Sequence, residues 1–323
     1  MAREPSAGGP GGAGAGTPPH RYRSDDEDSG RWRGFPHRPG DVVVSTRSKS
    51  GTTWAQMICA LLVFQTPDLP APLAEISPWL DWMGEPRAEV FDRLAAQPHR
   101  RFIKTHTPLD GIALDPRVTY LVMGRHPLDM AVSLYHQGDN IDRARQRRLT
   151  GQPEPEAPAA PGPARPALRE WLRGWTEWDP DPRRFPDSLP GVLHHLADAW
   201  DRVGRAAEGG PVVVLLHYDE LQADLEGAMR RLAGVLGMAV AEATWPELVA
   251  AARLPAMRAR AGELAPDTGG ILRSPAAFFR RGSSGAGREV LSEGELARYH
   301  RRVATMGPPG LLAWLHGEVE RRP

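Results

Sequence analysis

The sequence predicts an α/β fold, a single domain in which a central parallel β-sheet is flanked by helices on both faces. Four short, mostly apolar runs support this prediction, at residues 41–46, 101–105, 118–124 and 211–218. Apolar strands that each precede a helix imply a parallel sheet covered on both sides. Ligands of such sheets bind outside the carboxyl ends of the strands, so the chemistry is expected there.

The first strand and the helix after it form the clearest pair. Residues 41–46 (DVVVST) follow a Pro-Gly pair, and from Thr53 onward apolar residues recur at helical spacing. The third run precedes a helix that extends through Ser133, and the fourth precedes a helix that ends near Gly237. The apolar positions of the first helix are Trp54, Met57, Ile58, Leu61 and Leu62.

Two segments are expected to lie outside the packed core. Residues 1–30 combine GGPGGAGAGTPP with SDDEDSG and cannot bury enough apolar surface to offset the entropy of ordering, which predicts a disordered N-terminal tail. Residues 139–167 pass from a charged run into a Pro-rich one, a composition typical of a solvated loop or linker. We interpret residues 31–323 as one domain with this insertion as a candidate lid loop, although a domain boundary would have the same composition.

The charge and composition exclude several classes of protein. Lys plus Arg and Asp plus Glu each number 40, so the formal net charge is zero and no general attraction to nucleic acid is expected. The longest apolar stretch, residues 54–64, is shorter than the roughly 18 to 20 residues of a membrane span, and no secretion signal is evident. The single cysteine, Cys59, suits a reducing compartment. We therefore expect a cytoplasmic protein without stable membrane insertion; the sequence leaves its oligomeric state open.

The loop between the first strand and its helix, residues 47–54 (RSKSGTTW), has the features of an anion site. A glycine lets the backbone turn tightly, and the N–H groups at a helix start form a cradle with nearby hydroxyl groups. Lys49 adds a movable positive charge. The loop is P-loop-like but does not match GxxxxGK[ST], because Lys49 precedes Gly51. A Ser/Thr-capped helix with a surface lysine is the alternative interpretation.

Two further segments place polar side chains at the carboxyl ends of predicted strands. RHPLDMAVS opens a helix at its proline, and Arg125 with Ser133 could bind a phosphate group. RFIKTHTP places Lys104 and His106 two residues apart on one side of an extended segment, so both can point at one ligand. Each string taken alone would equally suit solvated or structural side chains.

Taken together, these segments resemble the cytosolic-type sulfotransferases. STRSKSGTTW is similar to the 5′-phosphosulfate loop of that family (TYPKSGTTW), RHPLDMAVS to its 3′-phosphate motif (RxPxDxxVS), and RFIKTHTP to its IKTH segment. FFRRGSSG, from residue 278, resembles the closing segment FxRKGxxG. The resemblance runs from about residue 38 to beyond residue 300. It implies a sulfotransferase, from a bacterium by its Ala, Arg and Pro bias, that uses 3′-phosphoadenosine 5′-phosphosulfate (PAPS) and needs no metal.

The resemblance also implies roles for individual residues. His106 would be the catalytic base, Lys49 would stabilise the bridging and leaving oxygens, and Lys104 would hold the sulfuryl oxygens. Arg125 and Ser133 would bind the 3′-phosphate. The other residues implied to contact PAPS are Ser50, Gly51, Thr52, Thr53, Trp54, Tyr218, Phe278, Arg280, Arg281 and Gly282.

For the acceptor the sequence gives only a class. Trp79 and Trp82 match in position a family segment on the acceptor side, and three more tryptophans follow the Pro-rich segment, at Trp171, Trp175 and Trp178. They suggest a small apolar acceptor with a hydroxyl or amine group, although packing in the core or in a lid would explain them equally well. Two rival functions remain: an ATP-dependent small-molecule kinase, and a nucleotide-binding relative without catalysis.

Overall fold

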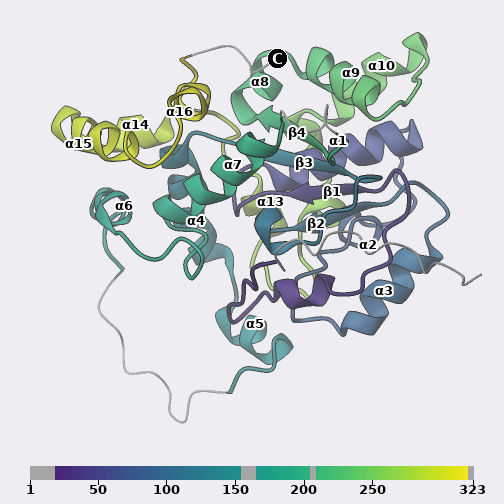
Figure 1. Cartoon of the computed structure of the whole chain (residues 1–323), viewed down its shortest axis with the longest axis horizontal. Helices are drawn as coiled ribbons and strands as arrows, with labels where there is room; N and C mark the ends of the chain where they lie inside the picture. The colour runs from purple at the N-terminus through teal and green to yellow at the C-terminus, as the bar shows by residue number, and fades with distance from the viewer. Residues whose placement is uncertain (1–18, 154–164, 204–208, 319–323) are drawn as a thin grey trace, which may run out of the picture.

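The computed structural model describes residues 19–153, 165–203 and 209–318 (Figure 1). Its centre is a four-stranded sheet in the order β2-β1-β3-β4, and every pair of neighbouring strands is parallel. The strands are β1 (Val42–Ser45), β2 (Phe102–Thr105), β3 (Thr119–Gly124) and β4 (Val212–His217). The predicted α/β class with a parallel sheet is confirmed.

Helices cover both faces of the sheet, and as predicted a helix follows β1, β3 and β4; β2 differs, because only a 3-10 turn, Leu109–Gly111, lies between it and β3. On one face a core cluster joins α1, α2 and α8 to α12, and on the other a second cluster joins α3, α4, α6, α7 and α14 to α16. The helices are α1 (Thr52–Phe64), α2 (Leu73–Ile76), α3 (Arg87–Ala96), α4 (Pro127–Asn140), α5 (Arg143–Leu149), α6 (Leu168–Glu177), α7 (Leu189–Val203), α8 (Tyr218–Ala223), α9 (Leu225–Val235), α10 (Trp245–Ala251), α11 (Leu254–Ala259), α12 (Ala261–Leu264), α13 (Pro275–Phe278), α14 (Ala286–Val290), α15 (Glu293–Val303) and α16 (Pro309–Leu315).

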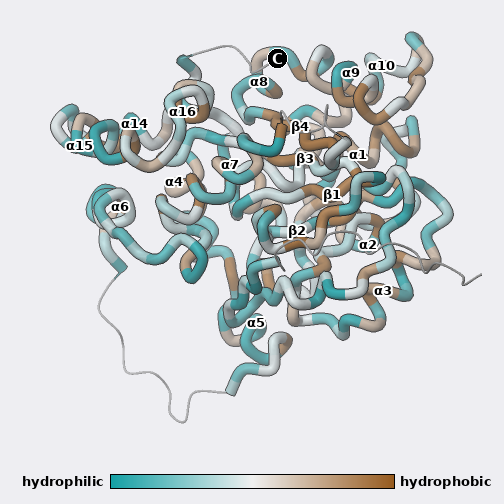
Figure 2. Tube along the Cα trace, in the orientation of Figure 1, coloured by the Kyte–Doolittle hydropathy of each residue, from teal (hydrophilic) through white to brown (hydrophobic). Residues whose placement is uncertain are grey.

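Strand side chains alternate between the two core clusters. Val42 and Val44 belong to the cluster that contains α1, whereas Val43 belongs to the cluster that contains α4. Because both faces of a parallel sheet are buried, its strands are mostly apolar, with polar residues such as Ser45, Lys104 and Thr105 at their carboxyl ends, and Figure 2 shows hydrophobic colour along them. This explains why the strands appear in the sequence as continuous runs of valine, leucine and isoleucine.

The strand register brings the carboxyl ends of all four strands to one edge of the sheet. Ser45 at the end of β1 lies opposite Thr105 of β2 and Val122 of β3. Gly124, the last residue of β3, lies opposite His217 at the end of β4. The loops that follow the four strands therefore start side by side, although they are far apart in the sequence.

Residues 19–30 pack against the domain, so the prediction of a disordered tail through residue 30 is wrong for this part. Tyr22 is buried, and its hydroxyl group donates to Asp110 Oδ1 at 2.7 Å. Asp28 donates its backbone N–H to the carbonyl of Asp81 at 3.0 Å. Composition missed this segment because its contacts are a single aromatic side chain and backbone pairing with a distant loop. Residues 1–18 lie outside the described residues.

The predicted insertion at residues 139–167 is ordered in its first part. The end of α4 and the whole of α5 lie within it, and Asp142 donates its backbone N–H to the carbonyl of Ile271 at 2.8 Å. Residues 154–164, the Pro-rich centre of the insertion, lie outside the described residues. The suggestion that the insertion acts as a lid stays a prediction.

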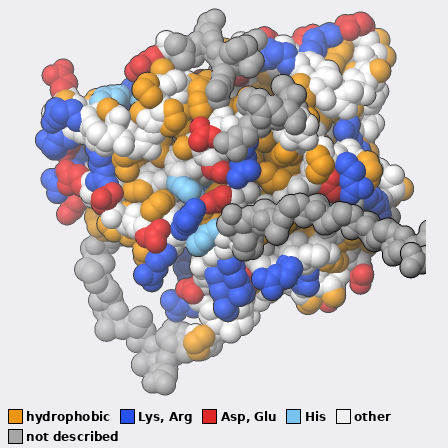
Figure 3. All heavy atoms as spheres, in the orientation of Figure 1, with side chains coloured by type: hydrophobic (Ala, Val, Ile, Leu, Met, Phe, Trp, Pro, Cys, Tyr) orange, Lys and Arg blue, Asp and Glu red, His pale blue; other side chains and the backbone are white. Residues whose placement is uncertain are grey.

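The exposed surface mixes charges of both signs, and Figure 3 shows basic and acidic side chains interspersed over the visible face. This agrees with equal totals of 40 basic and 40 acidic residues. Among the described residues no helix has the length and apolar character needed to span a bilayer.

A buried ion pair fixes the starts of the two neighbouring strands β1 and β2. Arg101 donates Nε to Asp41 Oδ1 at 2.9 Å and Nη2 to Asp41 Oδ2 at 2.5 Å. Their side chains are only 1% and 2% exposed. Removing one partner of a buried pair leaves an uncompensated charge, which is far more destabilising than the loss of an exposed pair.

We therefore expect Asp41→Ala to lower the free energy of unfolding by about 3 to 5 kcal/mol. Urea denaturation of the purified protein measures this change. Glu242→Gln, which breaks the exposed Arg230–Glu242 pair, is the control and should leave the midpoint nearly unchanged. A loss in Asp41→Ala no larger than that of the control would show that the buried pair does not fix the strands.

Candidate functional site

The loop after β1 turns sharply before α1 begins. Gly51 has a φ of +109°, a conformation that favours glycine, and a Cβ atom there would also lie 2.9 Å from Met123 Cε and displace the end of that side chain. Lys49 has a φ of +65°, and its carbonyl group accepts from Arg125 Nη1 at 3.1 Å. No side chain caps the first turn of α1. Its N–H groups are therefore available to an anion at the edge of the sheet.

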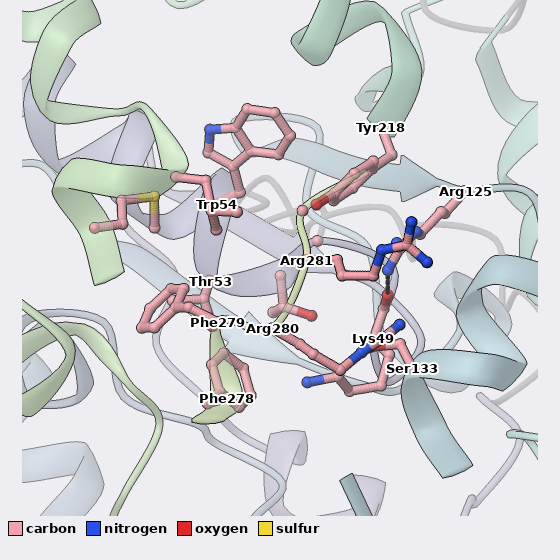
Figure 4. Close-up of a pocket in the computed structure, with 15 residues that line it drawn as sticks. Lys49, Thr53, Trp54, Arg125, Ser133, Tyr218, Phe278, Phe279, Arg280 and Arg281 are labelled. Atoms are coloured by element: carbon pink, nitrogen blue, oxygen red, sulfur yellow. Dashed lines mark hydrogen bonds between the residues drawn. The ribbon is translucent and has the colours of Figure 1, made fainter. Parts of the chain in front are cut away.

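The residues that the sequence predicted to contact PAPS surround one pocket of about 780 Å³, called here the cationic pocket (Figure 4). Figure 4 shows Arg125, Lys49 and Ser133 on one side and the aromatic rings of Trp54 and Phe279 on the other. Its lining residues are Lys49, Gly51, Thr52, Thr53, Trp54, Arg125, Ser133, Tyr218, Leu254, Met257, Phe278, Phe279, Arg280, Arg281 and Gly282.

Ser50 is the one predicted PAPS contact that is missing from the wall of the cationic pocket. It is buried, and its backbone N–H donates to the carbonyl of Arg47 at 3.2 Å. The residue therefore shapes the turn of the loop, while its neighbours in the sequence face the pocket.

Positive charge in the cationic pocket has few partners within the protein. In the described parts of the chain, no carboxylate lies within 4.0 Å of the charged groups of Lys49, Arg125 or Arg280. Arg125 is buried, and its Nε has no hydrogen-bond partner. Burial lowers the pKa of Lys49 to about 7, and the nearby charges of Arg125, Lys104 and Arg280 contribute to the shift. Such a cluster is the expected environment for a multiply charged anion.

Aromatic groups form the other side of the cationic pocket. Trp54 donates Nε1 to the carbonyl of Ala252 at 2.9 Å, which fixes the plane of its ring. The rings of Trp54 and Tyr218 meet edge to face, with centroids 5.0 Å apart, and the guanidinium group of Arg125 lies 4.2 Å from the centroid of the Tyr218 ring. The pocket thus combines aromatic rings, which can contact a planar ring of a ligand, with a cluster of positive charge.

Asp129 anchors the segment that closes the cationic pocket, a role that the sequence reasoning missed. Its two carboxylate oxygens accept the backbone N–H groups of Gly285 at 2.7 Å and Gly287 at 2.8 Å. Gly282, in the same segment, has a φ of +63°, and a Cβ atom there would lie 1.9 Å from Leu254 Cδ2. The RHPLDMAVS segment therefore contains a structural anchor, Asp129, beside its two candidate phosphate contacts, Arg125 and Ser133.

A second cavity, of about 880 Å³, lies next to the cationic pocket and is called here the histidine cavity. The two share Lys49, Thr52, Thr53 and Phe278 in their walls. The other residues that line the histidine cavity are Asp26, Glu27, Ser48, Trp79, Trp82, Lys104, His106, Leu134, Gln137, Ile141, Arg143, Gln146, Asp187, Pro266, Ile271 and Leu272.

His106 is held with one ring nitrogen free. Its Nδ1 lies 2.5 Å from the carbonyl oxygen of Thr46, and because a carbonyl only accepts, Nδ1 carries the hydrogen. Nε2 is then an acceptor. Burial, followed by the positive charges of Lys104 and Arg47, keeps the pKa of His106 well below its usual range. The imidazole is therefore neutral at physiological pH and able to accept a proton.

Lys104 lies beside His106 in the histidine cavity, as predicted from their two-residue spacing. Its Nζ is 3.9 Å from the centroid of the Trp79 ring. Burial lowers the pKa of Lys104 to about 8, and the carboxyl groups of Glu27 and Asp81 oppose the shift. Lys49, in the loop after β1, donates its Nζ to Gln137 Oε1 at 3.3 Å. Two lysines thus meet where the two cavities join.

A third cavity, of about 1000 Å³, continues from the histidine cavity and is called here the tryptophan cavity. The two share Asp26, Glu27, Leu134 and Asp187. Trp79 and Trp82 both line the histidine cavity; the Trp79 ring contacts the His106 ring, and the Trp82 ring stacks on Trp79 with centroids 5.2 Å apart. The tryptophan cavity is lined further by Tyr22, Arg23, Ser24, Arg47, Trp171, Trp175, Trp178, Arg184, Phe185, Pro186 and Ser188.

No cluster of three or more His, Cys, Asp or Glu side chains that could hold a metal ion occurs within residues 19–153, 165–203 and 209–318. The side chains that characterise the three cavities are lysines, arginines, aromatic rings and His106.

Comparison with known proteins identifies a family and close relatives. The model of the family described as "Sulfotransferase domain" matches residues 39–305. A protein of Mycobacterium bovis named glycolipid sulfotransferase is 43% identical over 311 residues, which cover 91% of this chain and 93% of that protein. A protein of the same name from Mycobacterium tuberculosis is 44% identical over 310 residues, with 91% and 93% covered. Human sulfotransferase 2B1 is 27% identical over 228 residues, with 69% and 53% covered.

Solved structures have the same fold. Mouse sulfotransferase SULT7A1 complexed with PAP aligns with a TM-score of 0.62 at 16% identity, covering 89% of this chain and 92% of that one. Retinol dehydratase in complex with androsterone and the inactive cofactor PAP aligns with a TM-score of 0.61 at 19% identity, covering 86% and 83%. Similarity at these identities extends to the arrangement of the strands and helices.

The role of Asp129 is tested by opening the closing segment. Asp129→Ala removes both acceptors for Gly285 and Gly287, and a hydrogen bond to a charged group is worth about 1.5 to 3 kcal/mol. We expect trypsin to cut after Arg280 or Arg281 at least about tenfold faster in this variant, measured by mass spectrometry over time. Glu289→Gln, which breaks the exposed pair with Arg281, is the control; cleavage as slow in Asp129→Ala as in that control would contradict the anchoring role.

Proposed function

The chain belongs to the sulfotransferase family, and on this premise we propose that its cationic pocket binds PAPS and its histidine cavity binds the acceptor. The protein is a PAPS-dependent sulfotransferase. PAPS supplies an activated sulfuryl group attached to a phosphate leaving group. The observation that carries the assignment of the pockets is their contact: they share the wall formed by Lys49, Thr52, Thr53 and Phe278, beside His106.

The residues of the cationic pocket fit the parts of PAPS. The start of α1, with Lys49, Thr52 and Thr53, provides cation, hydroxyl and N–H groups for the 5′-phosphosulfate. Arg125 has an unpaired buried Nε, and together with Ser133 it would hold the 3′-phosphate. Arg280 and Arg281 would add positive charge from the closing segment, and the adenine ring would pack at the wall of Trp54 and Tyr218.

The acceptor that suits the two further cavities is amphipathic. Asp26, Glu27 and Arg143 add polar groups to the histidine cavity. The tryptophan cavity beyond it is lined by several aromatic rings, including Trp175 and Phe185. A sugar hydroxyl placed near His106 would leave an attached lipid chain in the tryptophan cavity. The two mycobacterial relatives, both named glycolipid sulfotransferase, support this choice. We therefore take a glycolipid, or an alkyl glycoside of that chemistry, as the acceptor class.

The reaction follows from the arrangement of His106, Lys104 and Lys49. His106 Nε2 takes the proton of the acceptor hydroxyl group as the new oxygen–sulfur bond forms and the sulfur–oxygen bond to phosphate breaks. Lys104 neutralises charge on the sulfuryl oxygens and Lys49 neutralises charge on the leaving phosphate. Because Lys104 lowers the pKa of His106, pairing this lysine with an anion raises the basicity of the imidazole in the loaded enzyme.

The donor class is tested with 3′-phosphoadenosine 5′-phosphate (PAP) against ADP by calorimetry. We expect the wild type to prefer PAP, and Arg125→Ala with Ser133→Ala to lose this preference through roughly a 10- to 100-fold drop in PAP affinity, because charge-assisted bonds to the 3′-phosphate disappear. Arg117→Ala, an exposed arginine paired with Asp115, is the matched control and should bind PAP normally. Tighter binding of ADP than PAP would instead favour an ATP-dependent kinase.

The acceptor class and the base are tested together. We expect the wild type with PAPS and octyl glucoside to form a sulfated glycoside, detected by mass spectrometry. His106→Ala should lower kcat by about 10² to 10⁴ and leave PAP affinity within about twofold, because general-base help is lost while the cationic pocket is intact. His300→Ala, an exposed histidine, is the control. A wild-type rate in His106→Ala would remove this residue from the mechanism.

A further inference from the structure

Glu27 belongs to the N-terminal segment that was predicted to be a disordered tail, and it lies in the wall of the histidine cavity. Its segment pairs antiparallel with the loop that carries Trp82, through an isolated bridge between Glu27 and Trp82. Hydrogen bonds flank the bridge on both sides: Met83 donates its N–H to the carbonyl of Asp26 at 2.9 Å, and Asp28 donates to Asp81 at 3.0 Å. The backbone of Glu27 is therefore fixed relative to that loop.

The same loop is tied to the reaction centre. Asp81 accepts the backbone N–H of His106 at 2.9 Å and the hydroxyl group of Thr105 at 2.5 Å through its Oδ2. Trp79, two residues earlier, lies under Lys104 and meets the His106 ring edge to face at 4.7 Å. The position of Glu27 is thus coupled to that of His106 through one buried carboxylate.

Glu27 lines both the histidine cavity and the tryptophan cavity. Among the described residues its carboxyl group forms no hydrogen bond, and no basic group lies within 4.0 Å of it. The nearby Arg47 is engaged elsewhere, by Asp187 at 2.9 Å and by the carbonyl of His106. Lys104 packs on Trp79. The carboxyl group of Glu27 is therefore available to form hydrogen bonds with a ligand.

The chemistry of Glu27 suits a neutral polar ligand. Burial raises its pKa to about 8, with Arg47 acting against the shift and Asp81 supporting it. Near neutral pH the carboxyl group is then mostly protonated, and it can donate one hydrogen bond and accept others. Neighbouring hydroxyl groups of a sugar offer the matching donors and acceptors. An acceptor without them would displace water from this half-buried carboxyl group without replacing its hydrogen bonds, which costs binding energy.

We propose that Glu27 is a specificity-determining residue that hydrogen-bonds a hydroxyl group of the acceptor beside the one that is sulfated. It lies where the two cavities meet, so it contacts the junction between the sugar and the lipid chain. The residue thereby selects sugar-bearing acceptors over simple long-chain alcohols. This inference rests on the proposed function, because it assumes that the histidine cavity holds the acceptor.

The test compares Glu27→Ala with the wild type, using octyl glucoside and 1-octanol as ligands of the enzyme–PAP complex. Binding is followed by the fluorescence of the cavity tryptophans, and turnover by PAPS-dependent product formation. We expect Glu27→Ala to weaken octyl glucoside binding and raise its KM about tenfold, while 1-octanol binding changes less than about twofold. Glu27→Gln, which keeps a donor and an acceptor, should recover most of the affinity for the glucoside.

Matched controls separate this role from a structural one. Asp25→Asn alters an exposed carboxylate in the same segment and should leave both ligands unaffected. Thermal unfolding and PAP affinity, measured for every variant, identify any that are misfolded, in which case Glu27→Gln alone decides the comparison. Equal loss for glucoside and octanol, or no loss for either, would overturn the role of Glu27. If the wild type binds no glucoside, the acceptor class itself fails, and the role of Glu27 fails with it.

Discussion

The buried carboxylate of Asp81 is the contact on which the reaction centre depends. It accepts hydrogen bonds from Trp32, Thr105 and His106, and the backbone of its own residue pairs with Asp28. One side chain thus joins the N-terminal segment, the end of β2 and the proposed base. A carboxylate in such a place is expensive unless its lone pairs are satisfied, and several donors from separate segments offset that cost. The contact holds segments together that local propensity alone would leave apart.

The cationic pocket differs from Asp81, because its positively charged side chains have few negatively charged partners. Lys49, Arg125 and Arg280 share a small volume, and burial holds the pKa of Lys49 near 7. Mutual repulsion of this kind opposes the packed state of the protein without ligand, and a bound polyanion relieves it. Part of the binding energy of the nucleotide is therefore removed repulsion, in addition to new hydrogen bonds. In the proposed mechanism the same neutralisation would act on His106 through Lys104, so that a bound donor would raise the basicity of the imidazole.

Much of the fold and of the cationic pocket could be predicted, because their determinants are local in the sequence. Buried parallel strands require unbroken apolar runs, and the turn before α1 requires Gly51 beside Lys49. Contacts between residues far apart in the sequence were missed, because no local pattern marks them. Asp129 binds an N–H group 156 residues further along the chain, and Glu27 acquires its position from backbone pairing that has no side-chain signature. A composition rich in Gly and acidic residues gave no sign that residues 19–30 would pack.

The attachment of the closing segment to α4 has a kinetic consequence. Arg125 directly precedes this helix, and Asp129 within it holds Gly285 and Gly287. In the proposed complex a nucleotide would lie between α4 and residues 278–282, and any movement of that segment on release would be resisted by the two N–H bonds to Asp129. The residence time of the spent nucleotide is then governed by a hinge outside the chemical step. Release of the spent nucleotide, and not sulfuryl transfer, would then set the steady-state turnover.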